Sequence, residues 1–152
     1  MPHTSEANQD QPNIASVLSA SYHFMMSKIV EDLAVAGYKD LSKLQLHIVS
    51  RMNDDTTSVN DLAKRVGIAR QILDNLLSML IENGYVRVED EHISLAGRGR
   101  DALQIVAKTQ QNLESEWASL LGSAAYEELR THLNSLFRIT TTPPAGNNPR
   151  AR

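Results

Sequence analysis

A glycine at position 67 separates two stretches of the chain in which apolar residues recur every three or four positions. Before it, Ser58 and Asp61 have the spacing of a helix-capping pair. After it, a helix is predicted over about 69–83, and Gly84 follows where a helix commonly ends. The sequence therefore predicts two helices joined by a tight glycine turn.

The same periodicity predicts further helices on both sides of this pair. They are expected over about 13–36, 42–53, 96–121 and 123–139, with Ser42 and Gln45 forming a capping box at the second. Alternating apolar residues at 85–88 and 93–95 predict two short strands around an acidic tip, Glu89–Glu91. The expected fold class is mainly α with a small β-hairpin.

Length and composition limit the classes of protein that remain. The 152 residues, 41% of them hydrophobic, suit one domain over about 13–140, between polar tails at 1–12 and 141–152. The absence of cysteine excludes disulfides, thiol chemistry and cysteine-bound zinc. No segment suits a membrane span or a signal peptide, so a cytoplasmic protein without membrane contact is expected.

The order of the elements is that of a winged helix-turn-helix, in which the second helix of the pair faces DNA bases. The segment "SVNDLAKRVGIARQILDNLLSMLIENGYVRV", followed by "ISLAGRGRDAL", resembles the DNA-binding lobe of the multiple-antibiotic-resistance regulator (MarR) family. The resemblance, with the flanking helices, extends over about 13–139.

This resemblance implies a homodimer whose terminal helices, 13–36 and 101–139, interlock. Two winged lobes, about 42–100 in each chain, would then bind a pseudo-palindromic operator in double-stranded DNA and usually repress. Relatives often take small aromatic acids between the dimer helices and the DNA lobe. A pocket for such an effector is expected at His23, Met26, His47 and Arg51, with the arginine binding the carboxylate. The alternative is that these side chains only fill the core or the dimer interface.

The lobe's candidate DNA contacts are polar residues of the second helix and basic residues near the hairpin. They are Arg70, Gln71, Asn75, Arg87, Arg98 and Arg100. The arginines suit phosphates, and the amides can pair bidentately with adenine. Ile72 either touches a thymine methyl group or packs. For every residue, an ordinary solvated surface role is the alternative.

The sequence also departs from the family pattern. Ala69 and Ala96 stand where relatives tend to have a Ser or Thr that caps a helix. The acidic hairpin tip would repel phosphates, which argues against a wing contact with the minor groove. From Thr56 to Arg100, six basic residues balance six acidic ones.

Other functions were weighed against DNA binding. The five histidines are scattered and lack metal-site spacing, no nucleophile elbow or phosphate loop is present, and no cofactor is implied, so neither a metal protein nor an enzyme is expected. The neutral lobe and acidic tip leave one serious alternative, a winged helix that docks on another protein.

Overall fold

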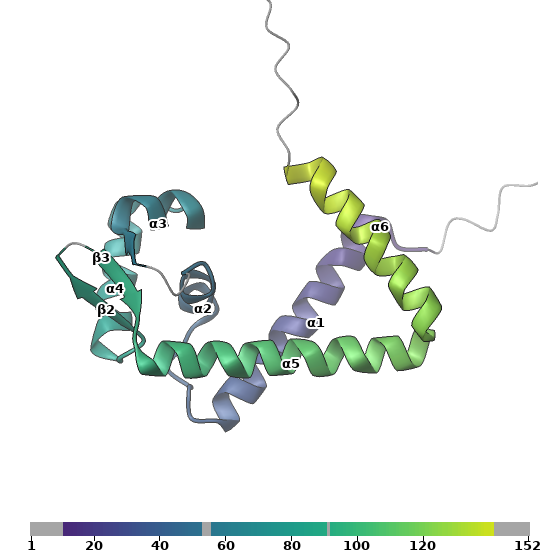
Figure 1. The fold of residues 1–152 in the computed structure, drawn as a ribbon, viewed down its shortest axis with the longest axis horizontal. Helices are drawn as coiled ribbons and strands as arrows, with labels where there is room; N and C mark the ends of the chain where they lie inside the picture. The colour runs from purple at the N-terminus through teal and green to yellow at the C-terminus, as the bar shows by residue number, and fades with distance from the viewer. Residues whose placement is uncertain (1–10, 53–55, 91, 142–152) are drawn as a thin grey trace, which may run out of the picture. The chain divides into compact units, whose positions relative to one another are not determined.

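The computed structural model describes residues 11–52, 56–90 and 92–141. Within them the elements follow in the order α1 (Ile14–Val35), α2 (Lys43–Ser50), β1 (Thr57–Ser58), α3 (Val59–Val66), α4 (Arg70–Glu82), β2 (Val86–Glu89), β3 (His92–Leu95), α5 (Gly97–Leu121) and α6 (Ser123–Thr141) (Figure 1). The chain divides between Gln110 and Gln111, within α5, into two compact units. Most of the two predicted tails, residues 1–10 and 142–152, lies outside the described residues.

Helix α1 begins and ends close to its predicted limits. The side chain of Asn13 accepts a hydrogen bond from the backbone N–H of Ser16 and so caps its first turn. Ile29 and Leu33 are its buried residues, whereas Ile14, Val17, Leu18 and Tyr22 of its first half remain exposed.

Helix α2 carries the predicted capping box but is shorter than predicted. The backbone N–H of Gln45 donates to the Ser42 hydroxyl, and that of Ser42 donates to the Gln45 side chain. The prediction of a helix to about residue 53 was wrong, because Arg51 and Met52 donate to carbonyls three residues back, those of Ile48 and Val49. This tightened last turn ends the α-helix at Ser50.

The predicted helix-turn-helix is confirmed in α3 and α4. Ser58 caps α3 by accepting from the N–H of Asp61. Gly67 ends α3 with a φ of 76°, a left-handed conformation that glycine adopts without the steric cost of a Cβ atom. Ala69 stands at the start of α4 and supplies no side-chain cap, as the sequence suggests.

The hairpin is confirmed and belongs to a three-stranded antiparallel sheet in the order β1-β3-β2. Val86 pairs with Leu95 and Glu89 with His92 across the hairpin. Strand β1 was not predicted, because two residues are too few to show an alternating pattern. It joins the start of α3 to the sheet, with Thr57 opposite Ile93.

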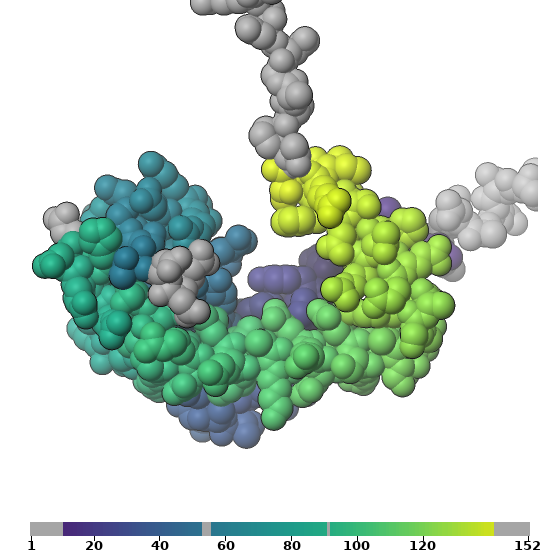
Figure 2. All heavy atoms as spheres, viewed as in Figure 1, coloured from purple at the N-terminus to yellow at the C-terminus, as the bar shows by residue number. Residues whose placement is uncertain are grey.

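One hydrophobic core serves the first unit. Its buried residues come from α1, α2, α3, α4, β2, β3, the first part of α5 and the loops between them. They are Ile29, Leu33, Leu41, Leu46, Ile48, Val49, Met52, Leu62, Ala63, Val66, Leu73, Leu77, Leu80, Tyr85, Val86, Ile93, Leu95, Ala102 and Val106. Figure 2 shows the part of this unit from α2 to β3 in blue to blue-green.

The second unit comprises the end of α5 and helix α6, the yellow end of the chain in Figure 2. Within Ser123–Thr141 no residue is buried. Leu129, Leu133, Leu136 and Phe137, all at least 40% exposed, follow the spacing of a single helix face. Helix α6 therefore presents an apolar stripe on its surface.

A close backbone contact holds the start of α5 against the start of the hairpin. A Cβ atom at residue 99 would overlap the carbonyl oxygen of Tyr85 and press on Leu95. The same carbonyl accepts a 2.9 Å hydrogen bond from the backbone N–H of Ala96. Only glycine at position 99 lets the two segments approach this closely.

We expect Gly99→Ala to lower the free energy of unfolding by about 2 kcal/mol or more, because the obstacle is a backbone atom of the core and not a mobile side chain. Gly97→Ala, two positions earlier in the same helix, has open space around its Cβ position and is the matched control. It should leave stability unchanged or raise it slightly. Urea unfolding of both variants tests this, and equal stabilities would contradict the close contact.

Candidate nucleic-acid interface

Helix α4 is oriented by the residues that it buries. Leu73, Leu77 and Leu80 lie in the core, and Leu76 packs against its edge. These four residues face one side, so the opposite side of the helix must face away from the lobe. The helix contacts both α3 and strand β2, as the second helix of a winged helix-turn-helix does.

The outward side of α4 carries polar groups that the protein itself does not use. Gln71, Asn75 and Ser78 are exposed and lie at helical spacing. Within the described residues, the side-chain amides of Gln71 and Asn75 have no hydrogen-bond partner, whereas the Ser78 hydroxyl donates to the carbonyl of Asp74. Both amides therefore keep a donor and an acceptor for another molecule.

Arg70 lies at the start of α4, where it was predicted to meet phosphate. Its Nε donates to Asp74 at 2.8 Å, and its Nη1 donates to the Asn60 side chain of α3. Both members of the ion pair are about half exposed. A pair of this kind contributes little net free energy, so a phosphate can compete for the guanidinium at small cost.

Arg87 and Arg100 also lie near the hairpin, as predicted, and Arg87 forms a loose, exposed ion pair with Glu89 at 3.8 Å. Arg87 donates from Nε to the hydroxyl of Ser94 across the strands, at 2.9 Å. Arg100 donates from Nη1 to the carbonyl of Leu95, at 2.8 Å. Both side chains are exposed, and their remaining N–H groups stay available to an anion.

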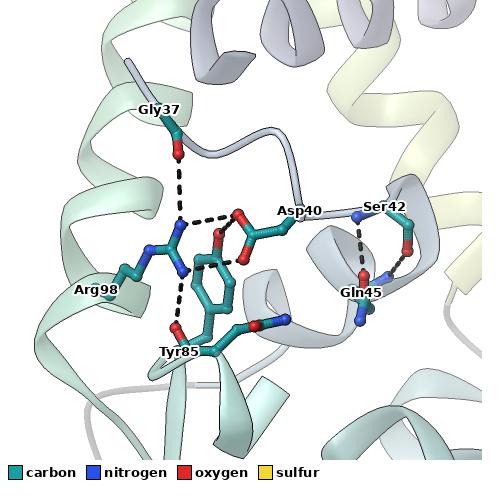
Figure 3. A network of polar contacts seen from close by, with 7 residues as sticks. Gly37, Asp40, Ser42, Gln45, Tyr85 and Arg98 are labelled. Carbon is teal, nitrogen blue, oxygen red and sulfur yellow. Dashed lines mark hydrogen bonds and ion pairs between the residues drawn. The ribbon is translucent and has the colours of Figure 1, made fainter. Parts of the chain in front are cut away.

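Arg98, the remaining predicted DNA contact, lies in a network of polar contacts within the lobe (Figure 3). Its two terminal nitrogens donate to the two carboxylate oxygens of Asp40, at 2.9 and 2.8 Å. They also donate to the backbone carbonyls of Asn83 and Gly37. Both terminal nitrogens are therefore used within the lobe, while the side chain remains 37% exposed, and the DNA contact of Arg98 stays a prediction.

Two tyrosines complete this network. The hydroxyl of Tyr85, whose side chain is fully buried, donates to Asp40 at 2.9 Å. The guanidinium of Arg98 lies 4.6 Å from the ring centre of Tyr85 and 5.4 Å from that of Tyr38, within the range of cation–π attraction. The network thus connects the loop after α1, the end of α4 and the start of α5.

The network shifts the acidity of two of its members. Burial alone would raise the pKa of Asp40, but the hydrogen bond from Tyr85 and the charge of Arg98 outweigh it and hold the pKa below its ordinary value. Burial raises the pKa of Tyr85, and so does donation to the Asp40 carboxylate. The carboxylate is therefore ionised and the phenol neutral at any physiological pH.

The hairpin tip is acidic on the surface. Glu89 and Asp90 are exposed, and Asp90 adopts a φ of 49° at the turn. Glu91, the third predicted acidic residue, lies outside the described residues. Two carboxylates at the end of the wing repel a phosphate backbone.

The four residues predicted to line an effector pocket differ in exposure. His23 and Arg51 are exposed, His47 is half-buried, and Met26 packs against the core. Among the described residues, no side-chain hydrogen bond or ring contact joins any of the four to another. The pocket stays a prediction.

Sequence reasoning missed Asn60, Asp40, Tyr38, Tyr85 and Gly99 as determinants of the site. Asp40 lies 58 positions from Arg98 in a loop without periodicity, so its role left no local signal.

In the part of the chain that the structure describes, no cluster of three His, Asp or Glu side chains could hold a metal ion. No helix there has the length and hydropathy to cross a membrane.

Comparison with known proteins identifies the fold. No protein-family model and no curated protein sequence matches the chain. Among solved structures, RV1404 from Mycobacterium tuberculosis is similar, with a TM-score of 0.72 and 15% sequence identity. The match covers 93% of this chain and 100% of that one. The MarR-family protein Rv2887 from Mycobacterium tuberculosis, solved in complex with DNA, has a TM-score of 0.65 and 16% identity, over 83% of this chain and 98% of that one.

NadR, solved in complex with 4-hydroxyphenylacetate, is similar with a TM-score of 0.57 and 19% identity, over 90% of this chain and 97% of that one. These likenesses show that the chain has the winged-helix fold of MarR-family proteins, and they confirm the fold that the sequence resemblance implies.

The network around Asp40 should contribute to stability in a pH-dependent way. Because the pKa of Asp40 is lowered on folding, its contribution is complete above the unfolded-chain value of 3.8 and is lost as the pH falls through the lower folded-state value. We expect Asp40→Asn to lower the free energy of unfolding by about 1 kcal/mol at neutral pH, since the pair is partly exposed. That difference should shrink below about pH 4.

Urea unfolding of both proteins between pH 3 and 7 measures this difference. Asp101→Asn, at an exposed carboxylate of α5, is the control and should cost little at any pH. A wild-type advantage over Asp40→Asn that grows on acidification would have the wrong sign for a lowered pKa.

Proposed function

We propose that this protein is a MarR-family transcriptional regulator that binds a pseudo-palindromic DNA operator as a homodimer and represses. The observation that carries the proposal is the exposed side of α4. The amides of Gln71 and Asn75 lie there without a hydrogen-bond partner among the described residues, and three leucines on the opposite side bury the helix in the core. The likeness to Rv2887, solved with DNA, supports it.

In this proposal base reading and backbone binding are assigned to different residues. Gln71 and Asn75 are four positions apart, hence on one side of the helix, and an amide side chain pairs bidentately with adenine in the major groove. Arg70, Arg87 and Arg100 bind phosphates with the N–H groups left free by their internal contacts. Arg98 holds the lobe together from inside.

The proposed homodimer rests on apolar surface of the terminal helices. Ile14, Val17, Leu18 and Tyr22 of α1 are exposed, and α6 presents the stripe of Leu129, Leu133, Leu136 and Phe137. Exposed stripes of this length favour association, and a second copy of the chain supplies matching surfaces by symmetry.

The effector assignment is the finer part of the proposal. A small aromatic acid would bind near His23, Met26, His47 and Arg51, with the carboxylate on Arg51. The structure of NadR with 4-hydroxyphenylacetate supports a ligand of this class. A bound acid that prefers one spacing of the two lobes would release DNA, so adding such acids to the protein–duplex complex tests the assignment. No release by any of them would favour a regulator controlled by its own abundance.

A second candidate function is docking on another protein through the same lobe. It is favoured by the exposed carboxylates of Glu89 and Asp90 at the hairpin tip and by the ion pair that neutralises Arg70. Salt distinguishes the two functions. Binding to duplex DNA weakens steeply as salt rises because counterions are released, whereas a docking lobe would hold no duplex even at low salt.

Selection of bound duplexes from a random pool should return a pseudo-palindrome. On that duplex, Gln71→Ala or Asn75→Ala should cost about 1–3 kcal/mol and relax one position of the site. Arg70→Ala should weaken binding to all DNA sequences alike and lower the slope of log affinity against log salt concentration by about one unit.

Changing Glu89, Asp90 and Glu91 together to Ala should raise affinity for every duplex without changing the preferred sequence. If the selection returned no duplex, and the variant with Glu89, Asp90 and Glu91 changed to Ala lost binding to a protein partner, the docking function would be supported instead.

Sedimentation at micromolar concentration should give twice the 16.9 kDa chain mass. Changing Leu133 and Leu136 together to Glu should yield monomers, because charges in an apolar interface lose their hydration. Thr131 and Ser135, which are exposed on the other side of α6, provide the matched control when changed together to Glu. A wild-type monomer, or equal behaviour of the two variants, would rule out this dimer.

A further inference from the structure

The outward side of α4 presents three kinds of side chain in separate lines. The ion pair of Arg70 and Asp74 forms one flank. The polar residues Gln71, Asn75 and Ser78 form the middle. Ile72 and Met79, seven residues apart and therefore two turns along the same line, form the other flank.

The apolar flank is exposed and does not belong to the core. The side chains of Ile72 and Met79 are 51% and 50% exposed, and neither residue packs with the hydrophobic core of the lobe. The half-exposed position favours a surface role for Ile72 over packing in the core. Isoleucine gives a helix no intrinsic advantage there, but its branched side chain is confined almost to one rotamer and so presents a rigid shape.

The chemistry of this surface matches one kind of base pair. Guanine is read mainly by arginine or lysine, and the only basic residue in the sequence of α4 is Arg70, which the proposed function assigns to phosphate. Amides read adenine, and the only apolar group on the major-groove edge of the bases is the C5 methyl group of thymine. A helix with amides beside an exposed isoleucine is therefore complementary to A·T pairs.

We propose that Ile72 is a specificity-determining residue that contacts the C5 methyl group of a thymine in each half-site, beside the adenine bound by Gln71 or Asn75. The inference rests on the proposed DNA-binding function and makes it more specific. It predicts that A·T pairs lie at the centre of each half-site. It also predicts that thymine is distinguished by a packing contact and not by a hydrogen bond.

Deoxyuridine tests the contact directly, because it pairs as thymidine does but lacks the methyl group. Each thymine of the selected duplex is replaced in turn by deoxyuridine, symmetrically in both half-sites, and affinity is measured with the full-length protein. We expect a loss of about three- to fivefold per half-site at one position, the loss that follows from one apolar methyl contact, and little change elsewhere. Ile72→Ala should bind the thymine and deoxyuridine duplexes equally.

Ile81→Ala is the matched control, since Ile81 is 42% exposed on the same helix but on the flank of Arg70 and Asp74. It should discriminate thymine from deoxyuridine as the wild type does. Combining each variant with each duplex in a double-mutant cycle removes any effect of deoxyuridine on the DNA itself. Both substitutions are on the surface, and thermal melting checks that the lobe remains folded.

The outcomes separate this inference from the function on which it rests. If no duplex is selected, the DNA-binding function fails and the inference fails with it. If a duplex is bound but deoxyuridine has no effect at any position, the function stands and the inference is overturned. It is also overturned if Ile72→Ala still prefers thymine, or if Ile81→Ala loses the preference equally.

Discussion

The approach of α5 to the hairpin at Gly99 and Tyr85 is the contact on which the rest of the lobe depends. Tyr85 is fully buried, its carbonyl accepts from Ala96, and a side chain at position 99 would collide with that carbonyl. A buried phenol needs a hydrogen-bond partner, which Asp40 supplies, and a carboxylate so placed needs a cation, which Arg98 supplies. Each group here satisfies a requirement created by the one before it.

This chain of requirements also positions helix α4, because α4 ends next to Tyr85 and Arg98. Arg98 donates to the carbonyl of Asn83, the residue that caps the end of α4, and the backbone N–H of Tyr85 donates back to Leu80 within that helix. The C-terminal end of α4 is thus attached to the α1–α2 loop through Asp40 and to α5 through Arg98. Its N-terminal end is attached to α3 by the bond between Arg70 and Asn60. The backbone of such a helix is held in place before any ligand arrives, which reduces the entropy lost on binding.

Local signals in the sequence predicted most of the fold and part of the candidate site. Caps at Ser42 and Ser58 and the turn at Gly67 lie within a few residues of the groups that they bind, so their patterns are readable from the sequence. The role of Arg98 could not be predicted from the sequence, because its partner Asp40 is remote in sequence and belongs to no motif. Strand β1 forms only because β3 offers an edge to Thr57 and Ser58, which the segment alone does not show. The exposed amides of α4 were predictable, since helical spacing separates them from Leu73 and Leu77.

The distribution of charge decides how a lobe of this kind can bind DNA. From Thr56 to Arg100, six basic residues balance six acidic ones. Five of the basic residues also donate hydrogen bonds within the protein, namely Arg65, Arg70, Arg87, Arg98 and Arg100. Phosphate contacts supply the sequence-independent part of affinity, so a lobe without net positive charge holds arbitrary DNA weakly. Its affinity for the right sequence must then come largely from base contacts, of which a single helix such as α4 makes few. Two lobes joined in one dimer overcome this limit, because once the first is bound the second binds at a high effective concentration. In the proposed function, the neutral lobe and the apolar stripe on α6 therefore fit together, because dimerisation through α6 would supply the affinity that the balanced charge does not.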